Sequence, residues 1–357
     1  MPNLSFRKKF KELLQPKDTG HNTHTSFSLC NKILKKIKPN SNQTFGVLFT
    51  LEFAIILIED YGINPKNIWL FGDSPEKKKI ANHLGINYNR INVLQEINMK
   101  FDVIVGNPPY NSGNEALWKK FSRLAIDLSP VVVFITPRNI VNGTITQKGA
   151  NDSGFFNIIK KNLEYLDFSA DNYFDVGKKI CGWIYNKNHN NKTFIETTKN
   201  ESLVEDITKY NYLPYNFDKK IDFSIFQKIY TNNNMLEFTR VNDKKNFVGP
   251  CLVAPEMKHI SLKYLFVVND LSSDSRIDAN DIVSYKLSQK EIAGCDDYIK
   301  SNLFKYIFNM FGGSDVRVGI YKKFPKIDFT KRWSNIDLYN LFQLSKEEIK
   351  HIEDVIK

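Results

Sequence analysis

The sequence has few cysteines, and nothing groups them. Its 357 residues include four, which lie far apart, form no CxxC pair and lack clustered histidine partners: Cys30, Cys181, Cys251 and Cys295. Zinc sites and disulfide frameworks both need such groups. We therefore expect no metal site and expect cysteines that are reduced and mostly buried.

Long apolar runs are also missing. The stretches at 45–58 and 131–136 are too short, or too often interrupted by polar residues, to span a bilayer. The first residues, MPNLSFRKKFKELL, lack the apolar core of a signal peptide. We therefore expect a cytoplasmic protein without a membrane partner.

Acidic residues are outnumbered by basic ones. Fifty Lys and Arg against 39 Asp and Glu give a formal net charge of +11, which favours a partner that carries many phosphates. An AT-rich coding sequence, which enriches Lys, Asn and Ile throughout a chain, would give the same balance. Charge alone therefore leaves nucleic-acid binding open.

The pattern of helices and strands predicts an α/β domain followed by a different one. From about residue 28 to 195, helical patterns alternate with short apolar strands, which is typical of a parallel sheet. After residue 195 the alternation stops, and short strands mix with loops and a predicted helix at 295–311. Ser345 and Glu348 form a capping box for a last helix. We place the boundaries at 1–195, 196–330 and 331–357.

Within the first region the expected elements follow from apolar spacing and from turn residues. Ser74, Pro75 and Gly85, for example, mark the start and end of a helix. We expect helices at 28–38, 52–63, 75–84, 115–128 and 154–168, and strands at 44–50, 67–73, 91–94, 101–106 and 130–140. Residues 173–187 fit a strand pair, or one strand with a turn at Gly177.

The stretch FDVIVGNPPYN at 101–111 carries the chemistry. Two prolines end the strand, at the sheet edge where open parallel sheets bind ligands. The Asn107 side-chain oxygen and a main-chain oxygen are acceptors, and Tyr110 offers an aromatic face, which together suit a planar substrate with an amino group, such as adenine. The alternative is a proline-rich loop that merely ends a strand.

FDVIVGNPPY resembles motif IV of the amino methyltransferases that use S-adenosylmethionine. The whole chain resembles the γ-type adenine-N6 DNA methyltransferases of restriction-modification systems and phages, and its last 34 residues, from FPKIDF onward, are similar to the end of many of them. The resemblance implies a Rossmann-like methyltransferase parallel sheet in 1–195 and a C-terminal mixed α+β target-recognition domain that binds DNA in 196–330. Residues 331–357 form a C-terminal helical segment.

The same resemblance implies a cofactor and partners. The cofactor is S-adenosylmethionine, and the substrate is double-stranded DNA whose adenine is flipped out of the stack. The resemblance also implies a cognate restriction endonuclease as a partner and a bacterial or phage-infected cell as the location. The expected oligomeric state is a monomer or a weak dimer.

Individual roles also follow from the resemblance. It assigns catalysis to Asn107, Pro108 and Tyr110, and stacking on the flipped base to Tyr110 and Phe174. It assigns cofactor binding to Thr25, where Ser26 replaces the usual proline, and to Asp73 as acceptor for the ribose hydroxyls. The three residues outside the 101–111 stretch also have purely structural explanations: a helix cap for Thr25, a turn for Asp73, and core packing for Phe174.

The family's glycine-containing loop after the first strand has no counterpart here. Gly46 lies too early, and residues 49–53 (FTLEF) take the place of the loop. Either the cofactor binds through a shortened loop, with Glu52 near its amino group, or the pocket is degenerate and the protein is a catalytically silent DNA-binding module. An RNA adenine or a protein glutamine amide is an alternative substrate. Asn92 and Gln95 are candidates for a third cofactor motif, and candidate phosphate contacts are Lys244–Lys245, Lys322–Lys323 and Lys331–Arg332.

Overall fold

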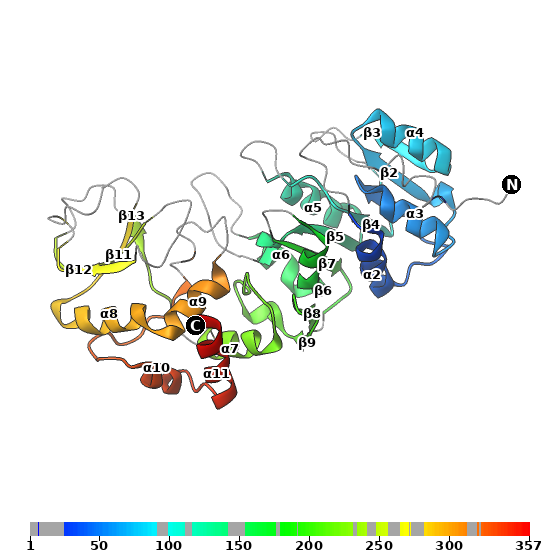
Figure 1. The fold of residues 1–357 in the computed structure, drawn as a ribbon. Helices are drawn as coiled ribbons and strands as arrows, with labels where there is room; N and C mark the ends of the chain where they lie inside the picture. Colours follow the sequence, from blue (N-terminus) through cyan, green and yellow to red (C-terminus); the bar gives the residue numbers. More distant parts are fainter. Residues whose placement is uncertain are drawn as a thin grey trace. The chain divides into compact units, whose positions relative to one another are not determined.

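The chain forms two compact units (Figure 1). The computed structural model describes residues 6, 25–90, 99–110, 116–141, 154–175, 179–190, 192–230, 234–240, 248–255, 265–270, 272, 282–312, 320 and 323–357. The first unit contains residues 1–140 and 155–209, and the second contains 141–154 and 210–357.

The first unit is built on a nine-stranded sheet in the order β3-β2-β1-β4-β5-β7-β6-β8-β9. The first five strands of that order pair in parallel, and β7 runs antiparallel to both of its neighbours. The strands are β1 (Phe45–Leu48), β2 (Ile68–Gly72), β3 (Asn87–Arg90), β4 (Val103–Gly106), β5 (Val131–Pro137), β6 (Leu163–Asp167), β7 (Ile180–Asn186), β8 (Thr193–Glu196) and β9 (Ser202–Glu205).

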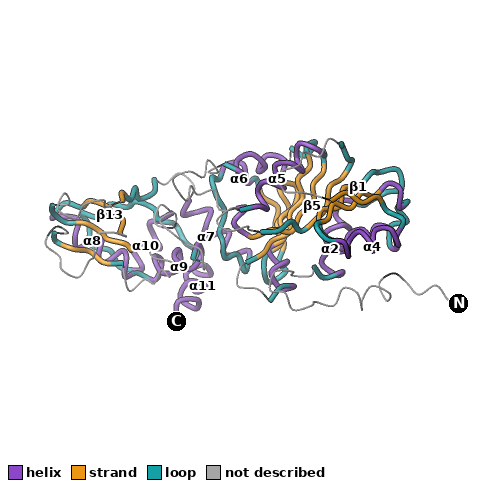
Figure 2. Tube along the Cα trace, turned by 90° about the horizontal axis from the view of Figure 1, so that it is seen from above, coloured by secondary structure: helices purple, strands orange, loops and turns teal. Residues whose placement is uncertain are grey.

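Helices cover both faces of this sheet. They are α2 (Phe27–Ile37), α3 (Leu51–Glu59), α4 (Pro75–Leu84), α5 (Leu117–Leu128) and α6 (Phe155–Ile159). Figure 2 shows α2 and α4 on one face and α5 and α6 on the other. A mostly parallel sheet between two helical layers confirms the predicted Rossmann-like fold class.

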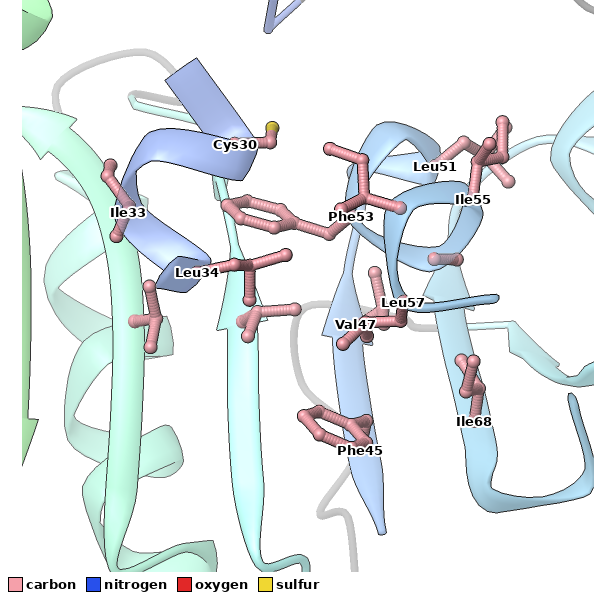
Figure 3. Close-up of a cluster of buried hydrophobic side chains, with 14 of the residues drawn as sticks. Cys30, Ile33, Leu34, Phe45, Val47, Leu51, Phe53, Ile55, Leu57 and Ile68 are labelled. Atoms are coloured by element: carbon pink, nitrogen blue, oxygen red, sulfur yellow. The ribbon is translucent and has the colours of Figure 1, made fainter. Parts of the chain in front are cut away.

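The core on the α2 side is apolar because these helices bury most of their apolar residues. Phe53 of α3 points toward Leu34 and Cys30 of α2, above Val47 of β1 (Figure 3), and all four are buried. All four cysteines of the chain are buried, as expected.

Local signals placed several elements correctly. Ser74 caps α4 by accepting a hydrogen bond from the Lys77 amide, and Gly85 ends it with a φ of 70°. One prediction is wrong in detail: residues 154–168 are not one helix, since 163–167 pair with β7 as strand β6. A strand covers 87–90, while the predicted strand at 91–94 and the predicted turn at Gly177 lie outside the described residues.

The second unit contains a four-stranded antiparallel sheet with helices. The strand order is β10-β13-β11-β12, from β10 (Thr239–Arg240), β13 (Ile282–Lys286), β11 (Cys251–Pro255) and β12 (Phe266–Val268). The helices are α7 (Lys220–Tyr230), α8 (Ile292–Lys300), α9 (Asn302–Phe311), α10 (Asn335–Leu341) and α11 (Lys346–Ile356).

The predicted helix at 295–311 is in fact two. Ser301 has an extended backbone, with φ −66° and ψ 153°, and its side chain accepts a hydrogen bond from the Phe304 amide to start α9. Ser345 and Glu348 form the predicted capping box of α11. A serine inside an apolar helical pattern can therefore cap a new helix.

The unit boundaries differ from those expected. The first sheet continues past residue 195 through β8 and β9, and residues 331–357 belong to the second unit. None of the helices in the described part of the chain has the length and apolar character that a bilayer span requires.

Candidate active site at the carboxyl edge of the sheet

Three strands end in one row at the carboxyl edge of the sheet. Leu48 of β1 lies opposite Phe71 of β2 on one side and opposite Gly106 of β4 on the other. A Cβ on Gly106 would lie 2.5 Å from the Leu48 carbonyl oxygen, so only glycine permits this close approach. The segments that begin at Phe49, Asp73 and Asn107 therefore leave the sheet side by side.

Asn107 is held by two threonine hydroxyls. Its backbone amide donates to Oγ1 of Thr50 at 2.9 Å, and its Nδ2 donates to Oγ1 of Thr25 at 2.9 Å. With Nδ2 committed to Thr25, the amide oxygen Oδ1 turns the other way. That oxygen is buried and has no hydrogen-bond partner among the described residues. A buried acceptor without a partner is costly, and it points to a donor on a ligand.

The sequence analysis predicted one of these two threonines as a site residue and missed the other. Thr25 was predicted, and it does not cap α2, because the Ser26 side chain accepts from the Leu29 amide instead. The Thr25 hydroxyl instead accepts the hydrogen bond from Nδ2 of Asn107. Thr50 was missed, although a threonine directly before an apolar helix is a recognisable signal for a helix start.

Pro108 and Tyr110 follow Asn107 with apolar surroundings. Pro108 is buried, and Tyr110 packs against the hydrophobic core around β1. Burial raises the pKa of Tyr110, while the nearby Asn107 side chain opposes part of that shift. The Tyr110 phenol therefore stays protonated at neutral pH, so it offers an aromatic face and cannot serve as a base.

Phe174 lies near the same core. It is half-buried and packs against the hydrophobic cluster that Tyr110 also touches. Phe174 also donates its backbone amide to the carbonyl of Asp171. The predicted pair of aromatic residues thus shares one apolar support, and their stacking on a base stays a prediction.

Arg138, which the sequence analysis missed, braces the segment before Phe174. Arg138 is fully buried directly after β5, and its Nη2 donates to the Phe168 carbonyl at 2.9 Å. The same nitrogen lies 3.5 Å from Oδ2 of Asp171, whose Oδ1 accepts from the Ile180 amide at 2.8 Å. A buried guanidinium therefore ties the segment that carries Phe174 to the start of β7.

The turn between β1 and α3 explains the missing glycine loop. Phe49 has a φ of 66°, a left-handed conformation that glycine normally supplies. Its amide donates to the Phe71 carbonyl, and the Thr50 amide donates to the Leu48 carbonyl, both at 2.9 Å. These two turn amides are consequently committed within the protein.

The start of α3 offers other polar groups. In the described structure Thr50 makes no side-chain cap hydrogen bond to α3, and Glu52 in its first turn is buried, with an exposed fraction of 6%. The Glu52 carboxylate lies close enough to Cys30 to add to the burial that raises the pKa of that thiol. A buried carboxylate beside an uncapped helix start suits the ammonium and carboxylate groups of an amino acid.

Asp73 lies at the end of β2 as predicted, and it is paired. Its Oδ1 accepts from Nζ of Lys77 at 2.8 Å, and the Asp73 side chain is 59% exposed. Asp73 and Glu52 together match the hydroxyl and ammonium groups of S-adenosylmethionine. The residues present thus fit that cofactor, except for the two committed turn amides.

The candidate phosphate contacts of the second unit fare unevenly. Lys323 is buried, with an exposed fraction of 2%, and its Nζ lies 4.7 Å from the ring centroids of Tyr212 and Phe311. The prediction that Lys323 contacts phosphate at the surface is therefore wrong. Arg332 is paired with Asp297. Lys244, Lys245 and Lys322 lie outside the described residues, as do the candidate cofactor residues Asn92 and Gln95.

Comparison with known proteins gives structural matches alone. No protein-family profile and no curated protein matches the sequence. One similar solved structure is a modification subunit of a putative type I restriction enzyme from Vibrio vulnificus YJ016, at 10% identity and a TM-score of 0.39 over 54% of this chain and 50% of that one. Another is a type I restriction-modification methyltransferase subunit from Streptococcus thermophilus, at 13% identity and a TM-score of 0.36 over 53% and 51%.

A third match comes from a study of the assembly of a type I restriction-modification system, at 12% identity and a TM-score of 0.39 over 48% of this chain and 44% of that one. The matched region thus spans about half the length of each of these three proteins.

Proposed function

We propose that this protein transfers a methyl group from S-adenosylmethionine to the N6 amino group of adenine in DNA. One observation carries the proposal: the Asn107 Oδ1 atom is a buried acceptor without a partner among the described residues, while Thr25 holds the Nδ2 atom and Thr50 holds the backbone amide. An amino group presents the donor that this oxygen lacks.

The chain's own residues supply positioning and charge stabilisation. The Asn107 Oδ1 accepts one N6 hydrogen and the Pro108 carbonyl accepts the other, so positive charge that develops on the nitrogen meets two oriented dipoles. Tyr110 and Phe174 would flank the ring. Bound S-adenosylmethionine supplies an electrophilic methyl group, and the surplus N6 proton leaves to water.

Several groups would hold the cofactor. Glu52 would pair with its ammonium group, the start of α3 would bind its carboxylate, and Asp73 would accept from its ribose hydroxyls. Adenine inside a duplex cannot reach Asn107, so the base must leave the stack first. The second unit is the candidate for reading the DNA sequence and holding the distorted duplex.

The test is transfer of a labelled methyl group to duplex DNA, RNA and a glutamine peptide, for the natural protein and for Asn107→Ala. We expect label on adenine N6 of DNA and loss of at least about a hundredfold in rate in the variant, since a charge-stabilising acceptor is removed. Asn42→Ala, on an exposed turn, is the matched control. Undiminished label in Asn107→Ala would refute the role of Asn107, and label on RNA or peptide would reassign the substrate.

A second candidate is a DNA-binding protein without catalysis. It is favoured by the Phe49 and Thr50 amides, which are committed to Phe71 and Leu48 and cannot serve a cofactor. Calorimetry separates the two candidates: this one requires DNA binding with no binding of S-adenosylmethionine, with or without DNA.

A further inference from the structure

Lys77 reaches across the end of β2 into the candidate cofactor site. A Cβ on Gly72 would lie 3.2 Å from Cδ and 3.3 Å from Cβ of Lys77, so the lysine stem runs over this glycine. At its far end, Nζ is 2.8 Å from Oδ1 of Asp73 and 5.6 Å from the ring centroid of Phe49. One ammonium group therefore engages the carboxylate at the end of β2 and the ring that follows β1.

The Phe49 ring is fixed for such a contact. Its edge-to-face packing on Phe121 of α5 has a centroid distance of 5.0 Å and an interplanar angle of 77°. The left-handed backbone at Phe49 costs free energy for a bulky residue, which persists only where surrounding structure enforces it. Such strain clusters at ligand sites.

The ring and the carboxylate match the two halves of a nucleoside. A planar base stacks on an aromatic face, and ribose hydroxyls donate to a carboxylate. The Lys77 ammonium holds both groups at once. An ordinary surface ion pair would need Asp73 alone, whereas this lysine packs along Gly72, beside Tyr88, and also reaches Phe49.

We propose that Phe49 is the stacking face for the adenosine part of the cofactor, and that Lys77 is a placeholder that must withdraw from Phe49 and Asp73 before adenosine binds. This inference rests on the proposed function, because it assumes that S-adenosylmethionine binds at this edge. It gives Phe49 a role in place of the missing glycine loop, and it makes Lys77 a competitor of the cofactor.

The experiment is calorimetric titration of the full chain with S-adenosylhomocysteine, which contains the adenosine part and carries no transferable methyl group. Removing a competing ion pair and cation–π contact by Lys77→Ala should tighten binding about threefold to tenfold. Phe49→Leu should weaken it about tenfold, since base stacking is lost. Lys79→Ala, an exposed lysine on the same helix, should change nothing.

A double-mutant cycle isolates the pair. If Lys77 competes at the ring, its removal should gain less in the Phe49→Leu background than in the natural chain. Thermal unfolding of each variant verifies that it is folded.

The titrations separate a failure of this inference from a failure of the proposed function. Binding by the natural chain with an unchanged or weaker affinity in Lys77→Ala overturns the inference and leaves the proposed function standing. No binding by either protein overturns both the inference and the cofactor of the proposed function.

Discussion

The side chain of Asn107 donates its Nδ2 to Oγ1 of Thr25 at 2.9 Å, across 82 positions of sequence. A residue that the resemblance assigned to the cofactor thereby orients the residue assigned to the substrate. With Nδ2 on the Thr25 hydroxyl, Oδ1 is the side-chain atom of Asn107 that has no partner among the described residues.

Thr25→Val should therefore impair methyl transfer more than cofactor binding. We expect kcat to fall about tenfold or more, because Asn107 loses the partner that orients it, while the affinity for S-adenosylmethionine changes little. Rate measurements with calorimetry check this. Thr25→Ser should retain most of the rate, and a large loss of affinity in Thr25→Val would instead make Thr25 a cofactor ligand.

Arg138→Met should loosen the segment that carries Phe174. Removing this buried cation leaves the Phe168 carbonyl without the donor described above and takes a charge partner from the half-buried Asp171. We expect a loss of about 3 kcal/mol in the free energy of unfolding. Denaturant titration measures it. The exposed Arg123→Met serves as control, and equal stability of both variants would contradict the bracing role.

Gly106→Ala tests the close approach of β4 to β1. The added Cβ would lie 2.5 Å from the Leu48 carbonyl oxygen and 2.9 Å from the Leu48 Cβ. Separation of the strands should cost about 1–3 kcal/mol of stability and displace Asn107, so activity should fall as well. At Gly154 a Cβ would meet nothing within 4 Å, which makes Gly154→Ala the matched control.

Lys323 should make stability depend on pH above neutrality. Burial lowers the pKa of Lys323 to about 7 from the usual 10.5 of an exposed lysine, although the rings of Tyr212 and Phe311 favour the ammonium form. Between these two pKa values the unfolded chain binds the proton and the folded chain does not. Stability therefore rises as pH increases from about 7 toward 10, and the full cost is present below about 7.

Lys323→Met should remove that dependence. We expect the second unit to gain about 2 kcal/mol at pH 6, on the order of the cost of a buried polar group, and to gain little at pH 10. Thermal unfolding at the two pH values checks this. An equal gain at both would show that packing, not titration, is responsible.

The sequence predicted what local patterns determine. The ends of α4, the capping box at Ser345 and the Asn107 segment at the end of a strand follow from residues next to one another, and the alternation of elements was enough for the sheet. The role of Thr25 toward Asn107 could not be predicted, since it depends on a contact between distant segments.

Two other features could not be predicted from the sequence, again for physical reasons. The missing glycine loop left a shortened loop and a degenerate pocket open, and it did not reveal that a left-handed turn forms with Phe49 in it, because that turn is held by bonds to Phe71 of β2 and Leu48 of β1. Lys323 looked like part of a basic surface pair, since charge in a sequence does not reveal burial.

The position of β1 between two parallel neighbours has a consequence for how the chain reaches its native state. β1 pairs with β2 on one side and with β4 on the other, and β4 lies more than 50 residues further along the chain. Parallel pairing over such separations forms slowly, because the loop must close before any contact stabilises it. The Asn107 segment therefore meets Thr50 only after β4 has paired with β1, and methyl transfer would report this late step of folding rather than the first.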